Sequence, residues 1–216
     1  CEMVKMDALV RENVKTCKYL QFDSDMHPIG AQLCGVNPKY ASTSAKMVED
    51  AGFDIVDLNC GCPVKKVVKD GSGSALLKTP ELIGEIIQEM VRSVKIPVSV
   101  KIRIGWNDDQ LIAPSIVKIA QSAGASAIFI HGRTKDQAYK GEINYDCIKE
   151  CKDNADNIKV VGNGNIWNER DAIGMFEKTD VDGVMLARGM FGNPFLIQDI
   201  LDYDQSQKIN SRTFDH

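Results

Sequence analysis

Short apolar segments alternate with longer amphipathic segments along most of the chain. The apolar runs contain few polar interruptions, which is typical of strands covered on both faces of a parallel sheet. Between them, apolar residues recur at helical spacing, as in Ile112, Ile116 and Ile119. Strands are therefore expected over residues 2–6, 29–35, 55–58, 96–103, 125–130, 158–161 and 183–186.

Helices are predicted between these strands. Asn37-Pro38 and Thr79-Pro80 each place a capping residue before a proline, which is a good helix start. The segment 59–79 is instead expected to be a long loop with one short helical turn at 75–77, and loops of this length are usually functional. Helices are expected over residues 7–20, 37–51, 79–94, 110–123, 144–154, 168–177 and 195–201.

The alternation of strand and helix predicts βα units that build a parallel sheet covered by helices. We count seven units, whereas a TIM barrel has eight. Such barrels often bind phosphate in the loops after their last two strands, and here those loops contain Gly162-Asn163-Gly164-Asn165 and Ala187-Arg188-Gly189. The sequence therefore predicts an incomplete (β/α)8 TIM barrel whose first strand is missing. A doubly wound sheet is the competitor, but no GxGxxG follows the first strand.

The chain is long enough for one domain with a substantial core, since it has 216 residues. Residues 1–201 are predicted to form the partial barrel. Residues 202–216 are polar and are expected to be a tail or the start of a further region.

Composition narrows the class of protein. A net charge of −4 argues against a dedicated nucleic-acid-binding module, although it allows an enzyme with a local basic rim. No apolar run approaches the ~20 residues that span a bilayer, so no membrane association is predicted. Seven irregularly spaced cysteines favour reduced thiols and a cytoplasmic location. Cys147 and Cys151 share a helix face without nearby histidines, so no metal site is predicted.

One cysteine stands where chemistry is plausible. Cys62 lies between Gly61 and Pro63 just after the strand at 55–58, so the backbone that carries its thiol is tightly constrained. The alternative is that Cys60 and Cys62 are simply two small buried side chains, since free cysteine is often buried.

Polar residues follow the other strands as well, and in a barrel these strand ends gather at one face. Each could have a structural role alone, but together they suit a flat, anionic, nitrogen-rich cofactor. An amide such as Gln32 can pair with a ring edge that donates and accepts hydrogen bonds. Lys101 can stabilise negative charge on a reduced ring, and the glycine loop with Arg188 can take a phosphate. These features describe flavin mononucleotide (FMN).

Four stretches together resemble the tRNA-dihydrouridine synthase family, most closely its bacterial branch. They are Asp57-Leu58-Asn59-Cys60-Gly61-Cys62-Pro63, Val100-Lys101-Ile102-Arg103-Ile104-Gly105-Trp106, His131-Gly132-Arg133-Thr134 and Gly162-Asn163-Gly164. The resemblance covers nearly the whole chain. It implies FMN-dependent reduction of uridine to 5,6-dihydrouridine in tRNA, with NADPH as the reductant and a monomeric enzyme.

The resemblance also implies residue roles. Cys62 matches the family's proton donor, and Asn59 matches a residue near the target uracil. The residues that match cofactor contacts are Gln32, Lys101, His131, Asn163, Gly164, Asn165, Ala187 and Arg188. Basic residues expected at the mouth of the barrel, where they could contact tRNA phosphates, are Lys65, Lys66, Lys69, Arg103 and Arg133. For Lys65 and Lys69 the alternative is a solvated surface charge, and this alternative is favoured for Lys69.

The sequence departs from the family pattern in several places. It begins after the Ala-Pro-Met flavin contact of the family's first strand, and it lacks the C-terminal helical RNA-binding domain. Asn165 stands where the family usually has Asp, and Ala187 stands where it usually has Gly. Two other functions remain open: an FMN-dependent barrel that acts on a free pyrimidine, and a non-catalytic, truncated remnant.

Overall fold

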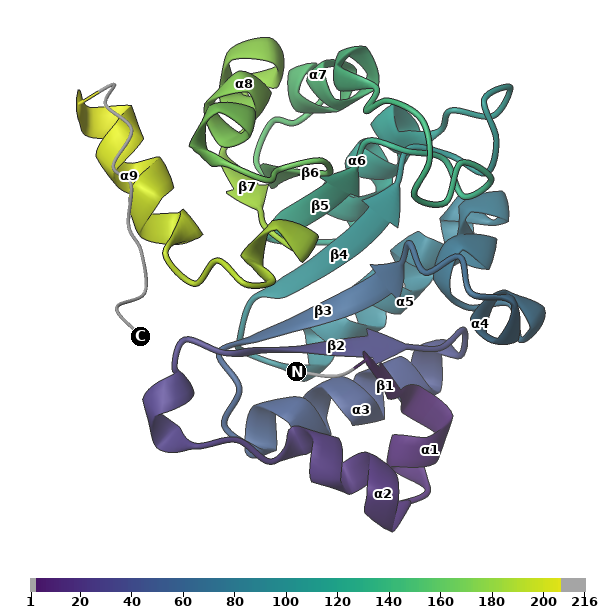
Figure 1. Ribbon diagram of the computed structural model, residues 1–216. Helices are drawn as coiled ribbons and strands as arrows, with labels where there is room; N and C mark the ends of the chain where they lie inside the picture. The colour runs from purple at the N-terminus through teal and green to yellow at the C-terminus, as the bar shows by residue number, and fades with distance from the viewer. Residues whose placement is uncertain (1–2, 207–216) are drawn as a thin grey trace.

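The computed structural model describes residues 3–206 (Figure 1). Within these residues, seven parallel strands form one curved sheet whose spatial order is the order of the chain. This arrangement confirms the predicted α/β class with seven βα units, one strand fewer than in a closed TIM barrel. The strands are β1 (Met3–Lys5), β2 (Gly30–Cys34), β3 (Ile55–Cys60), β4 (Val98–Arg103), β5 (Ala127–His131), β6 (Lys159–Asn163) and β7 (Gly183–Met185).

Helices cover the outer face of the sheet, and each packs against the next one along the chain (Figure 1). This succession of neighbours is what right-handed βα crossovers produce when they follow one another around a barrel. The covering helices are α3 (Pro38–Asp50), α5 (Pro80–Ser93), α6 (Ala113–Ser122), α7 (Tyr145–Asp153), α8 (Glu169–Thr179) and α9 (Leu196–Ser206).

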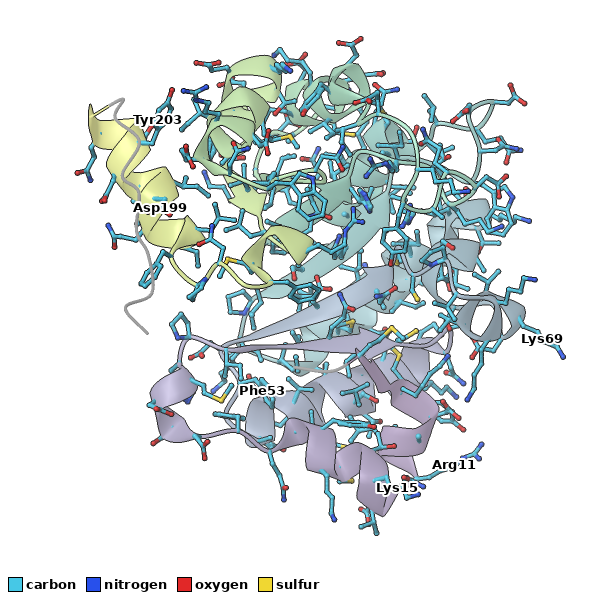
Figure 2. All side chains as sticks on the ribbon, viewed as in Figure 1. Arg11, Lys15, Phe53, Lys69, Asp199 and Tyr203 are labelled. Carbon is cyan, nitrogen blue, oxygen red and sulfur yellow. The ribbon has the colours of Figure 1, made fainter. Side chains whose placement is uncertain are left out.

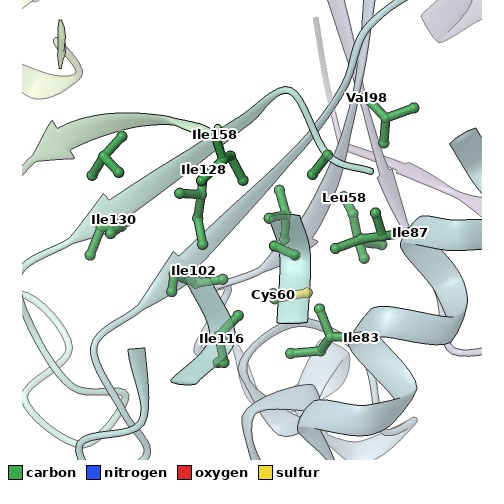
Figure 3. Close-up of a cluster of buried hydrophobic side chains, with 14 of the residues drawn as sticks. Leu58, Cys60, Ile83, Ile87, Val98, Ile102, Ile116, Ile128, Ile130 and Ile158 are labelled. Atoms are coloured by element: carbon green, nitrogen blue, oxygen red, sulfur yellow. The ribbon is translucent and has the colours of Figure 1, made fainter. Parts of the chain in front are cut away.

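The core lies between the outer face of the sheet and these helices. Figure 3 shows Leu58 and Cys60 of β3 beside Ile83 and Ile87 of α5, and all four side chains are fully buried. Because successive residues of a strand point to opposite faces, Asn59 projects to the other face, inside the curve of the sheet. β3 therefore buries apolar side chains on the outside, while its Asp57 and Asn59 lie on the inside.

The predicted helix over 7–20 is wrong as a single helix. The chain forms α1 (Met6–Val10), α2 (Val14–Cys17) and a 3-10 turn at Lys18–Leu20. Glu12 has a left-handed backbone with φ of +53°, which a continuous helix cannot contain. Asn13 then caps α2, since its side chain accepts a hydrogen bond from the Thr16 amide. A further 3-10 turn at Ser24–Met26 leads towards β2.

The segment 59–79 contains more helix than predicted. It forms α4 (Lys65–Lys69) and then the 3-10 helix η3 (Gly73–Lys78), which extends well beyond the expected turn at 75–77. Gly73 permits η3 to approach the strand end closely: its φ is +62°, and a Cβ there would lie 2.7 Å from the carbonyl oxygen of Cys62.

The last described helix, α9, extends past the predicted domain boundary. Because α9 ends at Ser206, the predicted boundary between 201 and 202 falls inside a helix. The rest of the predicted tail, 207–216, lies outside the described residues. Across residues 3–206, none of the helices is both long enough and apolar enough to cross a membrane.

Candidate active site

A cavity of about 400 Å³ opens at the carboxyl ends of the strands. It collects side chains from β2, β3, β4, β5 and β6 and from the loop after β7, as expected where parallel strands end together. The predicted residues in its lining are Gln32, Asn59, Cys62, Lys101, Arg103, His131, Asn163, Gly164, Asn165, Ala187 and Arg188. Arg133 and Lys66 are the predicted site residues outside the lining.

The backbone around Cys62 is held from two sides. Asn59 Oδ1 accepts hydrogen bonds from the amides of Gly61 and Cys62, at 3.2 and 3.0 Å. On the other side, the amide and the hydroxyl of Ser74 both donate to the Cys62 carbonyl oxygen at 3.0 Å. The Cys62 side chain is thereby carried on a fixed loop and is half-buried at the cavity wall.

Cys60 and Cys62 have different environments although they are two residues apart. Cys60 is fully buried in the core, and burial raises its pKa well above the usual range. The expectation of a small buried side chain therefore fits Cys60. Cys62 lies in the cavity, where a ligand can reach it.

A chain of hydrogen bonds runs from β3 to this loop. Asp57 accepts from Ser99 Oγ at 2.6 Å and from Gln32 Nε2 at 2.7 Å. Gln32 Oε1 in turn accepts from Asn59 Nδ2 at 2.6 Å. Because Asn59 Oδ1 receives the Cys62 amide, a carboxyl group is linked through two side-chain amides to the backbone of the cysteine.

Lys101 reaches across the inside of the sheet from β4 to β6. Its Nζ donates to Asn163 Oδ1 at 3.0 Å, while Asn163 Nδ2 donates to the Met185 carbonyl oxygen at 2.8 Å. The pKa of Lys101 is lowered to about 8, mainly by the loss of solvation; Asp57 opposes this change and the nearby Arg103 adds to it. Lys101 is therefore a cation at neutral pH that loses its proton easily.

His131, at the end of β5, is held as a neutral imidazole. Burial lowers its pKa to about 2, and the surrounding positive charges of Arg103 and Lys101 act in the same direction. Its Nε2 is buried and has no hydrogen-bond partner among the described residues. A buried ring nitrogen without a partner is unusual, so this atom is a candidate for a hydrogen bond to a ligand.

The loops after β6 and β7 form one cradle. Gly164 and Asn165 have positive φ values of +126° and +51°, a backbone form that often presents successive amides to an anion. The two loops touch closely, because a Cβ on Gly189 would lie 2.2 Å from the Ile166 carbonyl oxygen. Within the described chain, no acceptor is bonded to the amides of Gly164, Asn165, Arg188 and Gly189.

The side chain of Arg188 stands between two aromatic rings at the mouth of the cavity. Its guanidinium carbon lies 5.0 Å from the ring centroid of Tyr139 and 4.9 Å from that of Trp167. Such cation–π contacts hold an exposed arginine in place without using its N–H groups. The five donors of Arg188 therefore stay available to an anionic group.

The basic residues expected to reach tRNA differ in their placement. Arg103 is 2% exposed, and its Nε and Nη1 donate to the carbonyl oxygens of Gly61, Thr134 and Ala138. It lines the cavity but mainly braces loops. Arg133 is also 2% exposed, and its placement does not fit a phosphate contact. Its guanidinium donates to carbonyl oxygens of the following loop and to Asn165 Oδ1.

Lys66 is exposed on α4, away from the cavity lining, as are its neighbours Lys65 and Lys69. Figure 2 shows the Lys69 side chain extending outward from α4. This short basic helix follows the Cys62 loop directly, so it forms part of the rim rather than part of the cavity.

Several residues of the site had no predicted role, and four of them stand out. Asp57 and Ser99 belong to the hydrogen-bond chain, and Tyr139 and Trp167 line the cavity and flank Arg188. Asp57 could have been found, since it is a carboxyl group within an otherwise apolar strand. The two aromatic residues lie on loops whose paths leave no periodic signal in the sequence.

Comparison with known proteins gives a consistent result. The family model for dihydrouridine synthase (Dus) matches residues 1–214. A probable tRNA-dihydrouridine synthase of Rickettsia bellii is 42% identical over 205 residues, which cover 94% of this chain and 62% of that protein. The tRNA-dihydrouridine synthase B of Proteus vulgaris is 35% identical over 202 residues, with the same two coverages, 94% and 62%. The chain thus spans less than two thirds of these relatives.

A solved structure also resembles the chain. Phosphonopyruvate hydrolase, in a complex with oxalate and Mg²⁺, superimposes with a TM-score of 0.56 at 19% sequence identity. The match covers 81% of this chain and 62% of the hydrolase. At this level of identity the likeness concerns the fold alone.

Proposed function

The chain belongs to the dihydrouridine synthase family, and from this premise we propose that it carries the catalytic site of an enzyme that reduces uridine in tRNA to 5,6-dihydrouridine. FMN is the proposed cofactor and NADPH the proposed reductant. One observation carries the proposal: Cys62 shares a single cavity with Gln32, with Lys101 and with the glycine loop that follows β6.

The cavity has the donors that FMN requires. The free amides of Gly164 and Asn165, together with Arg188, suit the phosphate group. Lys101 provides a positive charge beside the place where a reduced ring would carry negative charge. The unpartnered Nε2 of His131 offers one further hydrogen bond. Gln32, Asn163 and Ala187 line the same cavity, and we assign them to the cofactor as well.

The chain's own residues have defined tasks in this reaction. When bound, FMN supplies the hydride that adds to C6 of the uracil. Cys62 Sγ donates the proton that adds to C5, so that the C5–C6 double bond is saturated, and the thiol then regains a proton from solvent. Asn59 holds the loop that carries this thiol and lines the cavity beside it.

A uridine in folded tRNA must leave its stack to enter a cavity of this kind. Lys65, Lys66 and Lys69 project from α4 at the rim, where they are exposed and can meet the phosphates that flank the extruded base. Arg103, whose Nη2 makes no hydrogen bond with the described residues, remains a candidate contact inside the cavity.

The test compares two substitutions that remove a thiol. Cys62→Ala is expected to reduce dihydrouridine formation in tRNA by at least ~10²-fold, because a general acid contributes about 10²–10⁴-fold. Reduction of the flavin by NADPH should be nearly unchanged. Cys60→Ala makes the same chemical change in the core and should retain dihydrouridine formation in protein that is folded.

Two results would count against the proposal. Equal loss of both half-reactions in Cys62→Ala would refute the role as proton donor. Reduction of free pyrimidines without any activity on tRNA would instead favour the alternative substrate. Both half-reactions can be followed separately, by flavin absorbance and by the dihydrouridine content of the tRNA.

A further inference from the structure

Asp57 has no part in the proposed chemistry, yet it occupies the origin of the hydrogen-bond chain described above. One carboxylate oxygen accepts from Ser99 Oγ and the other from Gln32 Nε2. The side chain lies on the inner face of β3, one inward position before Asn59. It therefore stands beneath the two amides that line the cavity.

The chain of hydrogen bonds can run in one direction only. A carboxylate is an acceptor, so Gln32 must turn its NH2 group towards Asp57 and its oxygen towards Asn59. Asn59 must then turn its NH2 group towards Gln32, which leaves Asn59 Oδ1 for the backbone amides of Gly61 and Cys62. Each of the three links is between 2.6 and 3.0 Å long.

The reverse direction creates a conflict at its far end. If both side-chain amides were flipped, the NH2 group of Asn59 would face the N–H groups of Gly61 and Cys62, so donors would face donors. If Gln32 alone were flipped, its oxygen would face the Asp57 carboxylate and its NH2 group would face the NH2 group of Asn59. Neither pair could then form a hydrogen bond. An unsatisfied group in such a site is costly, so the carboxylate and the backbone amides together impose one orientation.

We propose that Asp57 is a positioning residue, which fixes the orientation of the Gln32 and Asn59 amides and through them the loop that carries Cys62. The functional meaning of this arrangement rests on the proposed function, because that proposal assigns Gln32 to the cofactor and Cys62 to the substrate. Asp57 would then tie the cofactor side of the cavity to the proton-donor side by one rigid connection.

The surroundings of Asp57 act on its pKa in opposite directions, and burial has the largest effect. Burial raises the pKa of Asp57, whereas the hydrogen bonds from Ser99 and Gln32 and the charge of Lys101 act to lower it. The carboxylate likewise opposes the loss of positive charge on Lys101. Both of its oxygens accept hydrogen bonds, one from Ser99 and one from Gln32, which is the bonding geometry of a carboxylate.

The experiment reads the loop directly, by hydrogen exchange of the Gly61 and Cys62 amides in the folded protein. Asp57→Leu removes the acceptor and keeps the branched shape of the side chain, and we expect exchange of both amides to rise about tenfold, which corresponds to the loss of a typical hydrogen bond. Gln32→Leu breaks the next link and should give the same rise. It also serves as the second variant if Asp57→Leu does not fold.

A conservative variant separates geometry from charge. In Asp57→Asn the new amide oxygen can still accept from Gln32, while its NH2 group meets the Ser99 hydroxyl. The backbone amides of Gly61 and Cys62, at the other end of the hydrogen-bond chain, still impose the same orientation. Hydrogen exchange of these amides should therefore stay within about threefold of the original protein. If Asp57→Asn behaved like Asp57→Leu, charge rather than acceptor geometry would be required, and the orientation argument would fall.

A control variant removes another carboxyl group, both of whose oxygens also accept hydrogen bonds. Asp182 precedes β7, at the opposite ends of the strands, and accepts from Lys152, from Lys159 and from the Val160 amide. Asp182→Leu should lower the stability of the fold. It should not, however, raise hydrogen exchange of the Gly61 and Cys62 amides more than that of the β4 amides, which serve as the reference. The proposal is overturned if Asp57→Leu and Gln32→Leu show no more selective exchange than this control.

The measurement does not depend on activity towards tRNA. Protein that retains selective protection of the two amides but reduces no uridine would refute the proposed function and leave the positioning role standing. Protein that reduces uridine normally after Asp57→Leu, with unchanged exchange, would refute the positioning role alone.

Discussion

Acidification should destabilise the folded protein through His131, before most carboxyl groups titrate. The perturbation is a change of pH from about 7.5 to about 5.5, with His131→Asn as the comparison. In the folded state burial and neighbouring positive charges lower the pKa of His131 to about 2. In the unfolded chain a histidine has a pKa of about 6.5 and takes up a proton on acidification.

The sign and size of the effect follow from proton linkage. Above pH ~6.5 the imidazole is neutral in both states, so the stability is fully present. As the pH falls towards about 2, the unfolded state binds a proton that the folded state does not, and the free energy of unfolding declines. Between pH ~7.5 and pH ~5.5 this one group should lower the free energy of unfolding by about 1.4 kcal/mol.

Urea denaturation at the two pH values, without added flavin, measures the effect. The original protein should lose about 1.4 kcal/mol more than His131→Asn over this interval, because the variant lacks the titrating group. An NMR titration of the ring should also show no protonation of His131 above pH ~4. Equal pH dependence in both proteins, or a ring that titrates near pH ~6.5, would show that the imidazole is not held neutral.

Two further substitutions test the cradle and the lysine. Gly189→Ala should lower stability by about 1–3 kcal/mol and weaken FMN binding, because its Cβ would meet the Ile166 carbonyl oxygen at 2.2 Å. Gly174→Ala, where nothing lies within 4 Å of the new Cβ, should instead be neutral or stabilising in the same thermal melts and FMN titrations. For Lys101, whose pKa is about 8, FMN affinity should decline as its charge is lost above that pH. Lys101→Met should remove this dependence between pH ~7 and pH ~9, and a variant with the original profile would contradict the assignment.

Much of the fold could be predicted because its signals are local. Nearly continuous apolar runs such as the Ala-Ile-Phe-Ile sequence of β5 indicate strands covered on both sides, and the proline-marked start at Thr79 is an intrinsic helix signal. The break at Glu12 could not be predicted, because it depends on a left-handed residue followed by the cap at Asn13. A glutamate has no intrinsic preference for that conformation.

The site, like the fold, has features that the sequence predicts and others that it does not. The lining residues at the strand ends were accessible to sequence reasoning, because parallel strands bring their carboxyl ends together whatever the loops do. The partners of each side chain were not accessible. Arg133 follows β5 as expected, but the path of the loop after it places the carbonyl oxygens of Lys140 and Gly141 at its guanidinium. Loop paths of this kind leave no periodic pattern in the sequence, so the hydrogen-bond partners of Arg133 are known only from the folded structure.

The order of the strands has a consequence for how the chain is made. Each strand pairs with the next in sequence, as β1 does with β2 and β6 with β7, so the contacts that build the sheet join residues only a few dozen positions apart. Each pairing therefore closes a loop of moderate length, and the entropy cost of closing a loop rises only slowly with its length. On the ribosome, each new βα unit can dock on the units already formed, without waiting for a partner at the far end of the chain.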